Sequence, residues 1–126
     1  MKSLIVISSL LLLISCNESK QESVQNFIPG TYVRSFQDEF SKGNDTLVIG
    51  VRDPKMSLYR IEKRMGYVQQ NDGKMLTPQH TVEQWTAVYN KEHGQLHEQR
   101  KGKVLSFYPE ENKLSMGSSE YQKLSK

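Results

Sequence analysis

Two histidines in the second half of the chain have a spacing that could serve a metal ion. His93 and His97 are four residues apart and have acidic residues on both sides. On a helix, this spacing would place both imidazoles on one face, as zinc peptidases require. Gly94 interrupts the segment, however, and its neighbours are typical of a strand, in which residues four apart are separated by about 13 Å. We therefore predict a solvated hairpin tip and no metal site, and we place His80 in a loop.

Other catalytic arrangements are not evident in the sequence. It contains no G-x-S-x-G nucleophile elbow, no Gly-rich phosphate loop and no dinucleotide fingerprint. Glu110 and Glu111 are paired acids, which glycosidases use, but adjacent residues of a strand point to opposite faces. The run from Pro109 to Asn112 is also typical of a hairpin turn. We therefore predict that the protein is not an enzyme and binds no cofactor.

The single cysteine lies close to the start of the chain. Cys16 follows one lysine and an apolar run from Leu4 to Ile14. This run is about half of the roughly 20 residues that span a bilayer. A charged start, a short apolar stretch and a small residue before the cut site are typical of a secretory signal peptide. The thiolate of a cysteine is also the nucleophile that alkylation needs.

Leu13-Ile14-Ser15-Cys16 resembles the lipobox of bacterial lipoproteins. The resemblance implies cleavage between Ser15 and Cys16, a diacylglycerol on the Cys16 thiol, and an N-acyl chain such as palmitate on the new amine. Each buried methylene contributes about 0.8 kcal/mol, so two or three chains hold a domain firmly on a membrane. We expect the protein to be anchored in the outer membrane and to face the periplasm. Display on the cell surface is the alternative. An ordinary signal peptide ending near Cys16, or a buried free thiol, is the other interpretation.

The chain divides into three predicted segments. Residues 1–15 are the signal peptide, residues 16–26 a lipidated flexible tether, and residues 27–126 a single β domain. Val24 is the only aliphatic residue of the tether, so the tether cannot bury enough apolar area to offset its ordering entropy. The 17 basic and 14 acidic residues of the chain are interspersed, which argues against nucleic-acid binding. We expect contact with the membrane through the lipid, and with a protein partner.

From residue 27 onward, short β-like runs alternate with turn signals. Gly43-Asn44-Asp45 precedes one run, and Asn71-Asp72-Gly73 follows another. The predicted strands are 31–36, 46–51, 57–65, 81–89, 95–100, 104–108, 113–116 and 120–124. This spacing predicts an all-β fold, a small antiparallel up-and-down meander of about eight strands that forms a barrel or a sandwich. Residues 77–84 are the one region that could instead form a short helix, with Pro78 in its first turn.

Aromatic residues are the remaining candidates for a binding role. Strand 81–89 places Trp85 and Tyr89 on one face, and Tyr59 lies on the alternating strand 57–65. Trp85, Tyr89 and Tyr59 are therefore candidate ligand-facing residues of an aromatic-lined cavity, and a packed core is the alternative. Residues 100–103 form a basic hairpin tip, which is either a soluble turn or a contact for anionic headgroups or a partner.

Three segments carry a wider resemblance. Phe27–Tyr32, Glu83–Tyr89 and Glu120–Leu124 together resemble a group of small bacterial lipoproteins, some encoded near conjugative elements, that have no established activity. Gly30-Thr31-Tyr32 and Glu120–Lys123 are similar to lipocalin-like domains, which implies a small β-barrel. We expect a non-enzymatic binding or interaction module of the envelope, acting as an accessory of a larger assembly. The alternative is a lipocalin-like carrier of a small apolar ligand.

Overall fold

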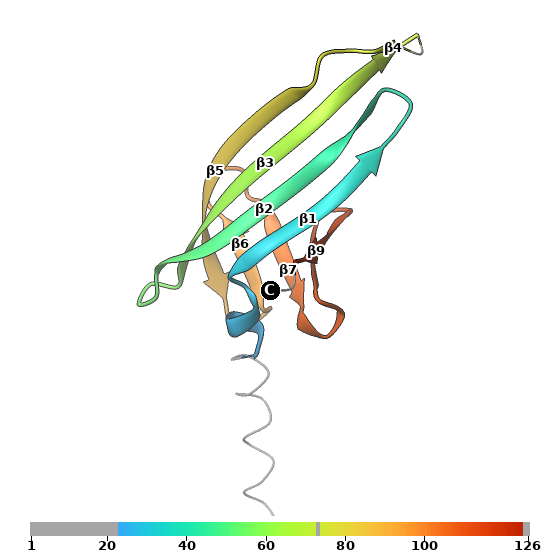
Figure 1. Ribbon diagram of the computed structural model, residues 1–126. Helices are drawn as coiled ribbons and strands as arrows, with labels where there is room; N and C mark the ends of the chain where they lie inside the picture. The colour runs from blue at the N-terminus through green and yellow to red at the C-terminus, as the bar shows by residue number, and fades with distance from the viewer. Residues whose placement is uncertain (1–22, 73, 125–126) are drawn as a thin grey trace, which may run out of the picture.

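The computed structural model describes residues 23–72 and 74–124. The predicted signal peptide at residues 1–15, its cleavage site at Ser15 and Cys16, and the lipidation of Cys16 lie outside the described residues. Strands dominate the part of the chain that the structure describes (Figure 1). Within that part, no helix has the length and apolar character needed to cross a membrane.

Nine strands follow one another along the described chain. They are β1 (Gly30–Gln37), β2 (Ser41–Asp53), β3 (Leu58–Asn71), β4 (Lys74–Met75), β5 (Gln79–Asn90), β6 (Gln95–Glu98), β7 (Val104–Tyr108), β8 (Lys113–Met116) and β9 (Ser119–Lys123). A 3-10 turn, η1 (Pro109–Glu111), connects β7 to β8. Glu110 and Glu111 are exposed in this turn, which confirms the prediction of a hairpin turn there.

Eight of these strands form a closed antiparallel barrel. Their order is β2-β1-β9-β8-β7-β6-β5-β3, and an additional pairing between β2 and β3 closes the ring. Strand β4 pairs only with the end of β3. The predicted all-β, up-and-down antiparallel fold is therefore confirmed, and it is a barrel rather than a sandwich. Closure pairs strands that would otherwise present an unprotected sheet edge.

The short helix considered for residues 77–84 is not formed. Strand β5 begins at Gln79 and pairs with β3 from Gln79, opposite Tyr67, to Val88, opposite Leu58. This ladder satisfies backbone groups along most of the segment. The β-branched Thr81 and Val82 also favour an extended backbone over a helical one.

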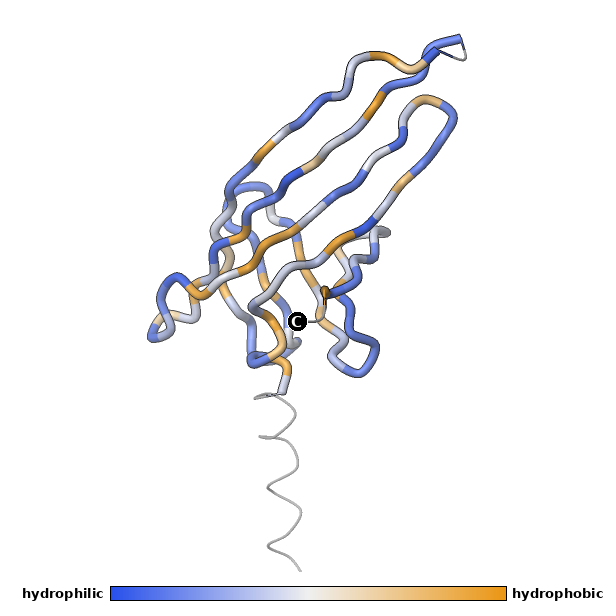
Figure 2. The backbone as a smooth tube through the Cα atoms, in the orientation of Figure 1, coloured by the Kyte–Doolittle hydropathy of each residue, from blue (hydrophilic) through white to orange (hydrophobic). Residues whose placement is uncertain are grey.

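Alternate residues of the long strands build the core. Tyr59 and Ile61 on β3, and Trp85, Ala87 and Tyr89 on β5, are buried, as the alternation in the sequence predicts. Figure 2 shows apolar and polar residues alternating along the strands. The core consists of Ile28, Tyr32, Leu47, Ile49, Tyr59, Ile61, Trp85, Ala87, Tyr89, Leu96, Leu105, Phe107, Leu114 and Tyr121. These buried side chains form one packed cluster inside the closed barrel, and full burial of one such apolar side chain contributes about 1.5–3 kcal/mol.

Four long strands continue past the closed ring as a free-standing sheet, which we call the arm (residues 34–46, 62–72 and 74–84). Strand β9 pairs with β1 only at Tyr32 and Val33, and β6 pairs with β5 only from Ala87 to Asn90. Beyond these points, the outer edges of β1 and β5 have no strand partner within the described chain (Figure 1). The arm therefore extends the wall of the barrel on one side only.

Strands β2 and β3 approach each other closely within the arm, at Gly43. A Cβ atom at this position would overlap the carbonyl oxygen of Gly66 and would lie 2.8 Å from the Cα atom of Tyr67. We expect Gly43→Ala to lower the free energy of unfolding by about 1–3 kcal/mol, because the two backbones must separate to admit the methyl group. Urea unfolding followed by circular dichroism measures the change.

Gly50, on the same strand, is the matched control for this prediction. A Cβ atom there meets no atom within 4 Å. We expect Gly50→Ala to leave the stability unchanged or to raise it by about 0.4–1 kcal/mol, because alanine restricts the unfolded chain. If the two substitutions changed the stability equally, the close approach of β3 to Gly43 would not be the reason that alanine is unfavourable there.

The end of the barrel opposite the arm is closed by the N-terminal part of the described chain, which we call the plug (residues 23–28). Residues 23–27 are helical, Ile28 is fully buried, and Phe27 packs edge-on against Tyr32, with ring centroids 5.8 Å apart. The Tyr32 hydroxyl lies 2.9 Å from the carbonyl oxygens of both Phe27 and Ile28, and it can donate to either. Lys123 Nζ also donates to the Phe27 carbonyl and lies over the Phe27 ring.

The plug differs from the flexible tether that was expected over residues 16–26. Within its described part, residues 23–26, the backbone is helical and Val24 packs against the core. The physical reason is tertiary: the core at the plug end of the barrel offers Val24 an apolar surface that no neighbour in the sequence provides. The folded unit therefore includes residues that precede the predicted domain boundary at residue 27.

Candidate functional site

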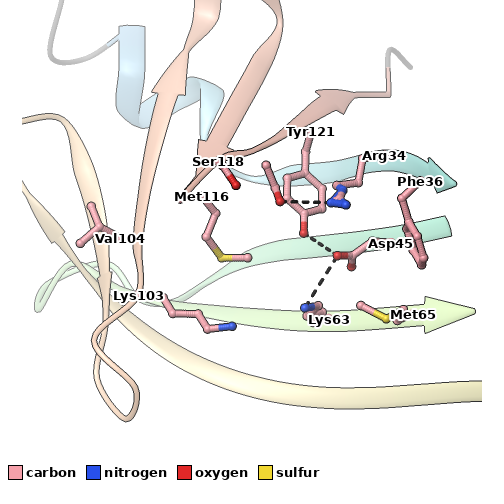
Figure 3. Close-up of a pocket in the computed structure, with 12 residues that line it drawn as sticks. Arg34, Phe36, Asp45, Lys63, Met65, Lys103, Val104, Met116, Ser118 and Tyr121 are labelled. Atoms are coloured by element: carbon pink, nitrogen blue, oxygen red, sulfur yellow. Dashed lines mark hydrogen bonds and ion pairs between the residues drawn. The ribbon is translucent and has the colours of Figure 1, made fainter. Parts of the chain in front are cut away.

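A pocket of about 670 Å³ lies at the end of the barrel from which the arm extends, and Figure 3 shows residues that line it. The plug is at the opposite end of the barrel (Figure 1). Its charged lining residues are Arg34, Asp45, Lys63 and Lys103, and its apolar lining residues are Phe36, Met65, Val104 and Met116. The β8–β9 turn, residues 117–118, completes the wall together with Ser119 and Tyr121 of β9. The site is therefore assembled from strands β1, β2, β3, β7, β8 and β9 and from the β6–β7 and β8–β9 turns at the rim.

The charged residues continue the inward-facing rows of the barrel core. On β1, Arg34 follows the buried Tyr32 by two positions, and on β3, Lys63 follows the buried Ile61 in the same way. Because strand side chains alternate between faces, residues two apart share a face. Each row thus changes from apolar to charged where the strand leaves the closed ring, and this change creates the pocket.

Asp45 is the buried carboxylate of the site, with only 2% of its surface exposed. Its Oδ2 accepts a hydrogen bond from the Tyr121 hydroxyl at 2.5 Å and lies 3.7 Å from Lys63 Nζ (Figure 3). Its Oδ1 is buried without a hydrogen-bond partner among the described residues. Burial, and then the hydrogen bond to Asp45 and its negative charge, raise the pKa of Tyr121, so the hydroxyl stays protonated as a donor. The Lys63 ammonium offsets the carboxylate charge, which would otherwise be costly to bury.

Arg34 is held between two aromatic rings at the edge of the pocket. Its guanidinium carbon lies 5.4 Å from the Phe36 ring centroid and 5.7 Å from that of Tyr121, and Nη1 donates to Ser119 Oγ at 3.1 Å. No carboxylate among the described residues forms an ion pair with it. The cation is thus positioned by π faces and a hydroxyl, which leaves donors of the guanidinium for a ligand.

Trp85 lies beneath two of the lysines of the pocket. Lys103 Nζ is 4.7 Å and Lys63 Nζ is 5.8 Å from its ring centroid. The indole N–H donates to Glu83 Oε2 at 3.1 Å, and Glu83 in turn pairs with Lys101 at 3.7 Å. Glu83 is therefore engaged by Trp85 and Lys101, and Lys103 has no carboxylate partner in the described part of the chain.

A buried carboxylate also organises the β6–β7 turn that carries Lys103. Glu98 Oε1 accepts the backbone N–H groups of Arg100 and Lys101 at 3.0 Å each, and Lys101 N–H also donates to Oε2 at 2.6 Å. Burial opposes ionisation of Glu98, but the backbone N–H donors of the turn outweigh it and lower the pKa of this carboxyl below its ordinary value of 4.5. Glu98 thus fixes the backbone that presents Lys103 to the pocket.

We expect Glu98→Gln to lower the free energy of unfolding at pH 7 by about 1–2 kcal/mol, because hydrogen bonds to a charged acceptor are replaced by weaker ones. Since the folded-state pKa is depressed, the contribution of Glu98 is complete above pH 4.5 and is lost as the pH falls below 4.5 through the folded-state pKa. Urea unfolding at pH 7 and pH 3 should therefore show a smaller gap between wild type and variant at pH 3. An equal gap at both pH values contradicts this assignment.

The three candidate ligand-facing aromatics are placed in or beside the core. Trp85, Tyr89 and Tyr59 are each buried, and only Trp85 approaches the pocket, through the lysines above it. The Tyr89 hydroxyl has no hydrogen-bond partner among the described residues, and burial followed by the nearby Tyr59 raises the pKa of Tyr89. Tyr59 also borders a smaller pocket of about 340 Å³ near the plug.

Of the two histidines predicted at a solvated hairpin tip, only His93 lies there, and His97 is half-buried on strand β6. His93 is exposed in the β5–β6 turn, and His97, on β6, has its Nε2 3.4 Å from Gln95 Oε1. His80 lies on β5 rather than in a loop. In residues 23–72 and 74–124, no group of three His, Cys, Asp or Glu side chains is arranged to hold a metal ion.

Comparisons with protein-family models, with curated proteins and with solved structures find no match for this chain. Its class is therefore defined by its own fold and site. It is a small closed antiparallel β-barrel whose open end carries a pocket with charged and apolar walls. The volume of this pocket falls within the range of about 300–1,000 Å³ that ligand sites occupy.

Proposed function

We propose that this protein is a lipid-anchored, non-enzymatic binding module of the cell envelope. It recognises another envelope component at the open end of the barrel and acts as an accessory of a larger assembly. The observation that carries this proposal is the pocket itself, in which Arg34 and Lys103 stand beside apolar walls. The lipobox-like Leu13-Ile14-Ser15-Cys16 supports the anchor.

The packed interior favours recognition of a partner at the open end of the barrel over enclosure of a ligand inside the barrel. Trp85, Tyr89 and Tyr59 are buried together with the apolar residues of the other strands, so they contribute to a core. The arm adds a second feature suited to recognition, because the outer edges of β1 and β5 leave backbone groups unpaired within the described chain. Extended segments of partner proteins bind to such edges.

A site-specific photo-cross-linker at Ser118, in the wall of the pocket, tests this proposal in intact bacterial cells. We expect a discrete adduct from Ser118 and none from the same cross-linker at Lys55, which is exposed in the β2–β3 turn, outside the pocket lining. The same adducts from both positions, or only a diffuse background from Ser118, would argue against a specific partner there. The anchor is tested separately, since labelled palmitate should enter the wild type and not Cys16→Ser.

A second candidate function is lipocalin-like carriage of a small apolar ligand. The closed barrel and the apolar side chains of Phe36, Met65 and Met116 in the pocket favour it. Native mass spectrometry of the gently purified full-length protein should then reveal a bound molecule of constant mass. Protein that is consistently free of any such molecule would eliminate this candidate and leave recognition of a partner.

A further inference from the structure

Two cations at the mouth of the pocket are positioned without a carboxylate counter-ion among the described residues. Arg34 is held by Phe36, Tyr121 and Ser119, and Lys103 is held over the Trp85 ring. They enter the pocket from different walls, β1 and the β6–β7 turn (Figure 3). Because aromatic faces orient these cations without neutralising them, both charges remain available to an anion.

The other charges of the site cancel one another. Asp45 and Lys63 form an ion pair of opposite charges 3.7 Å apart, and Glu83 is paired with Lys101. The excess positive charge of the lining therefore comes from Arg34 and Lys103. This arrangement matches an anion of charge close to −2 better than a single carboxylate.

We propose that the pocket binds a phosphate monoester carried on an apolar group. A phosphate monoester has a charge of about −1.5 to −2 at pH 7 and three strong acceptor oxygens, which suit the guanidinium of Arg34 and the ammonium of Lys103. The apolar carrier lies against Phe36, Met65 and Met116. This inference names the ligand chemistry of the open-end site, and it rests on the proposed function.

The single tryptophan of the chain reports directly on this site. Lys103 Nζ lies 4.7 Å from the Trp85 ring centroid, so an anion that contacts Lys103 changes the electrostatic surroundings of the indole. The test titrates dodecyl phosphate, below its micelle concentration, into the full chain from residue 16 carrying Cys16→Ser, so that no attached acyl chain competes. Trp85 emission and isothermal titration calorimetry are both recorded.

The comparison ligands test separately the phosphate and the apolar carrier of the proposed ligand. We expect dodecyl phosphate to bind at least about tenfold more tightly than dodecanoate, dodecanol or inorganic phosphate. Dodecanoate and dodecanol have the apolar chain but no phosphate group, and inorganic phosphate has no apolar chain. Equal binding of inorganic phosphate would show a site for the free ion, and equal binding of dodecanol an apolar site; either result overturns the proposal. Failure of all four to bind also overturns it, while the cross-linking result at Ser118 still judges the proposed function on its own.

Matched variants locate the binding. Arg34→Met and Lys103→Met keep the aliphatic length and should each weaken dodecyl phosphate by about tenfold. Lys101→Met is the control, because Lys101 lies in the same turn but is paired with Glu83 and is outside the pocket lining. It should leave the affinity unchanged. Circular dichroism verifies that each variant is folded, and an unchanged affinity in folded Arg34→Met and Lys103→Met contradicts the assignment.

Discussion

Asp45→Ala is expected to lower the free energy of unfolding by about 3 kcal/mol, because breaking a buried ion pair leaves an uncompensated charge. The substitution leaves the half-buried Lys63 ammonium without its carboxylate and the Tyr121 hydroxyl without its acceptor. Asp45→Asn should have a smaller effect, because an amide oxygen still accepts from Tyr121. Urea unfolding followed by far-UV circular dichroism gives the three free energies.

The double variant Asp45→Ala/Lys63→Met distinguishes a lost charge pair from lost packing. We expect it to recover part of the stability, since the uncompensated cation is removed. Glu62→Ala is the control, because Glu62 pairs at 3.1 Å with the exposed Arg64, and such surface pairs contribute about 0–1 kcal/mol. A double variant as unstable as Asp45→Ala alone would show that the ion pair is not the cause.

Ile28→Ala is expected to cost about 2–5 kcal/mol, because it removes a fully buried side chain from the plug. The cavity would form within the hydrophobic core, to which Ile28 belongs together with Tyr32 and Phe107. The same urea unfolding measures the change. We also expect the plug to loosen before the barrel does, which faster amide hydrogen exchange at the backbone N–H of Ile28 would reveal.

Leu124→Ala is the matched control for the plug, since Leu124 is an aliphatic residue that is half exposed. Surface substitutions of this kind usually change stability by less than about 0.5 kcal/mol. If Ile28→Ala were as mild as Leu124→Ala, residues 23–28 would be an accessory to the barrel and not part of its core.

The strands and their inward faces could be predicted because alternation is a local property of the sequence. The order of Tyr59 and Ile61 on one strand, and of Trp85, Ala87 and Tyr89 on another, identifies the core side of both. The turn at Pro109 is equally local, because proline and the residues after it end the strand there. Up-and-down order then follows from short connections between successive strands.

The site could not be predicted in the same way, because the sequence around its buried carboxylate, Asp45, is typical of a turn. Gly43-Asn44-Asp45 is a turn signal in the sequence, but β2 runs through it from Ser41 to Asp53. Pairing with β1 on one side and with β3 on the other makes this segment extended. Asp45 is therefore buried, and the partners Tyr121 and Lys63 that make burial tolerable come from distant strands.

A local signal for the site does exist, and it is a charged residue in an inward-facing row. Lys63 shares a face with Ile61, and Arg34 shares a face with Tyr32. Lys103 was recognised as part of a basic hairpin tip, but its position over Trp85 depends on Glu98 and on the barrel closure. The spacing of residues in the sequence does not reveal this position of Lys103, because it depends on contacts between distant parts of the chain.

The plug and the pocket lie at opposite ends of the barrel. Ser23, the first described residue, belongs to the plug, and seven residues of extended chain span at most about 25 Å. If Cys16 carries the predicted lipid, the anchor is attached at the plug end of the barrel, and the pocket opens at the end farthest from the attachment point. A ligand or partner would then reach the pocket without passing the plug.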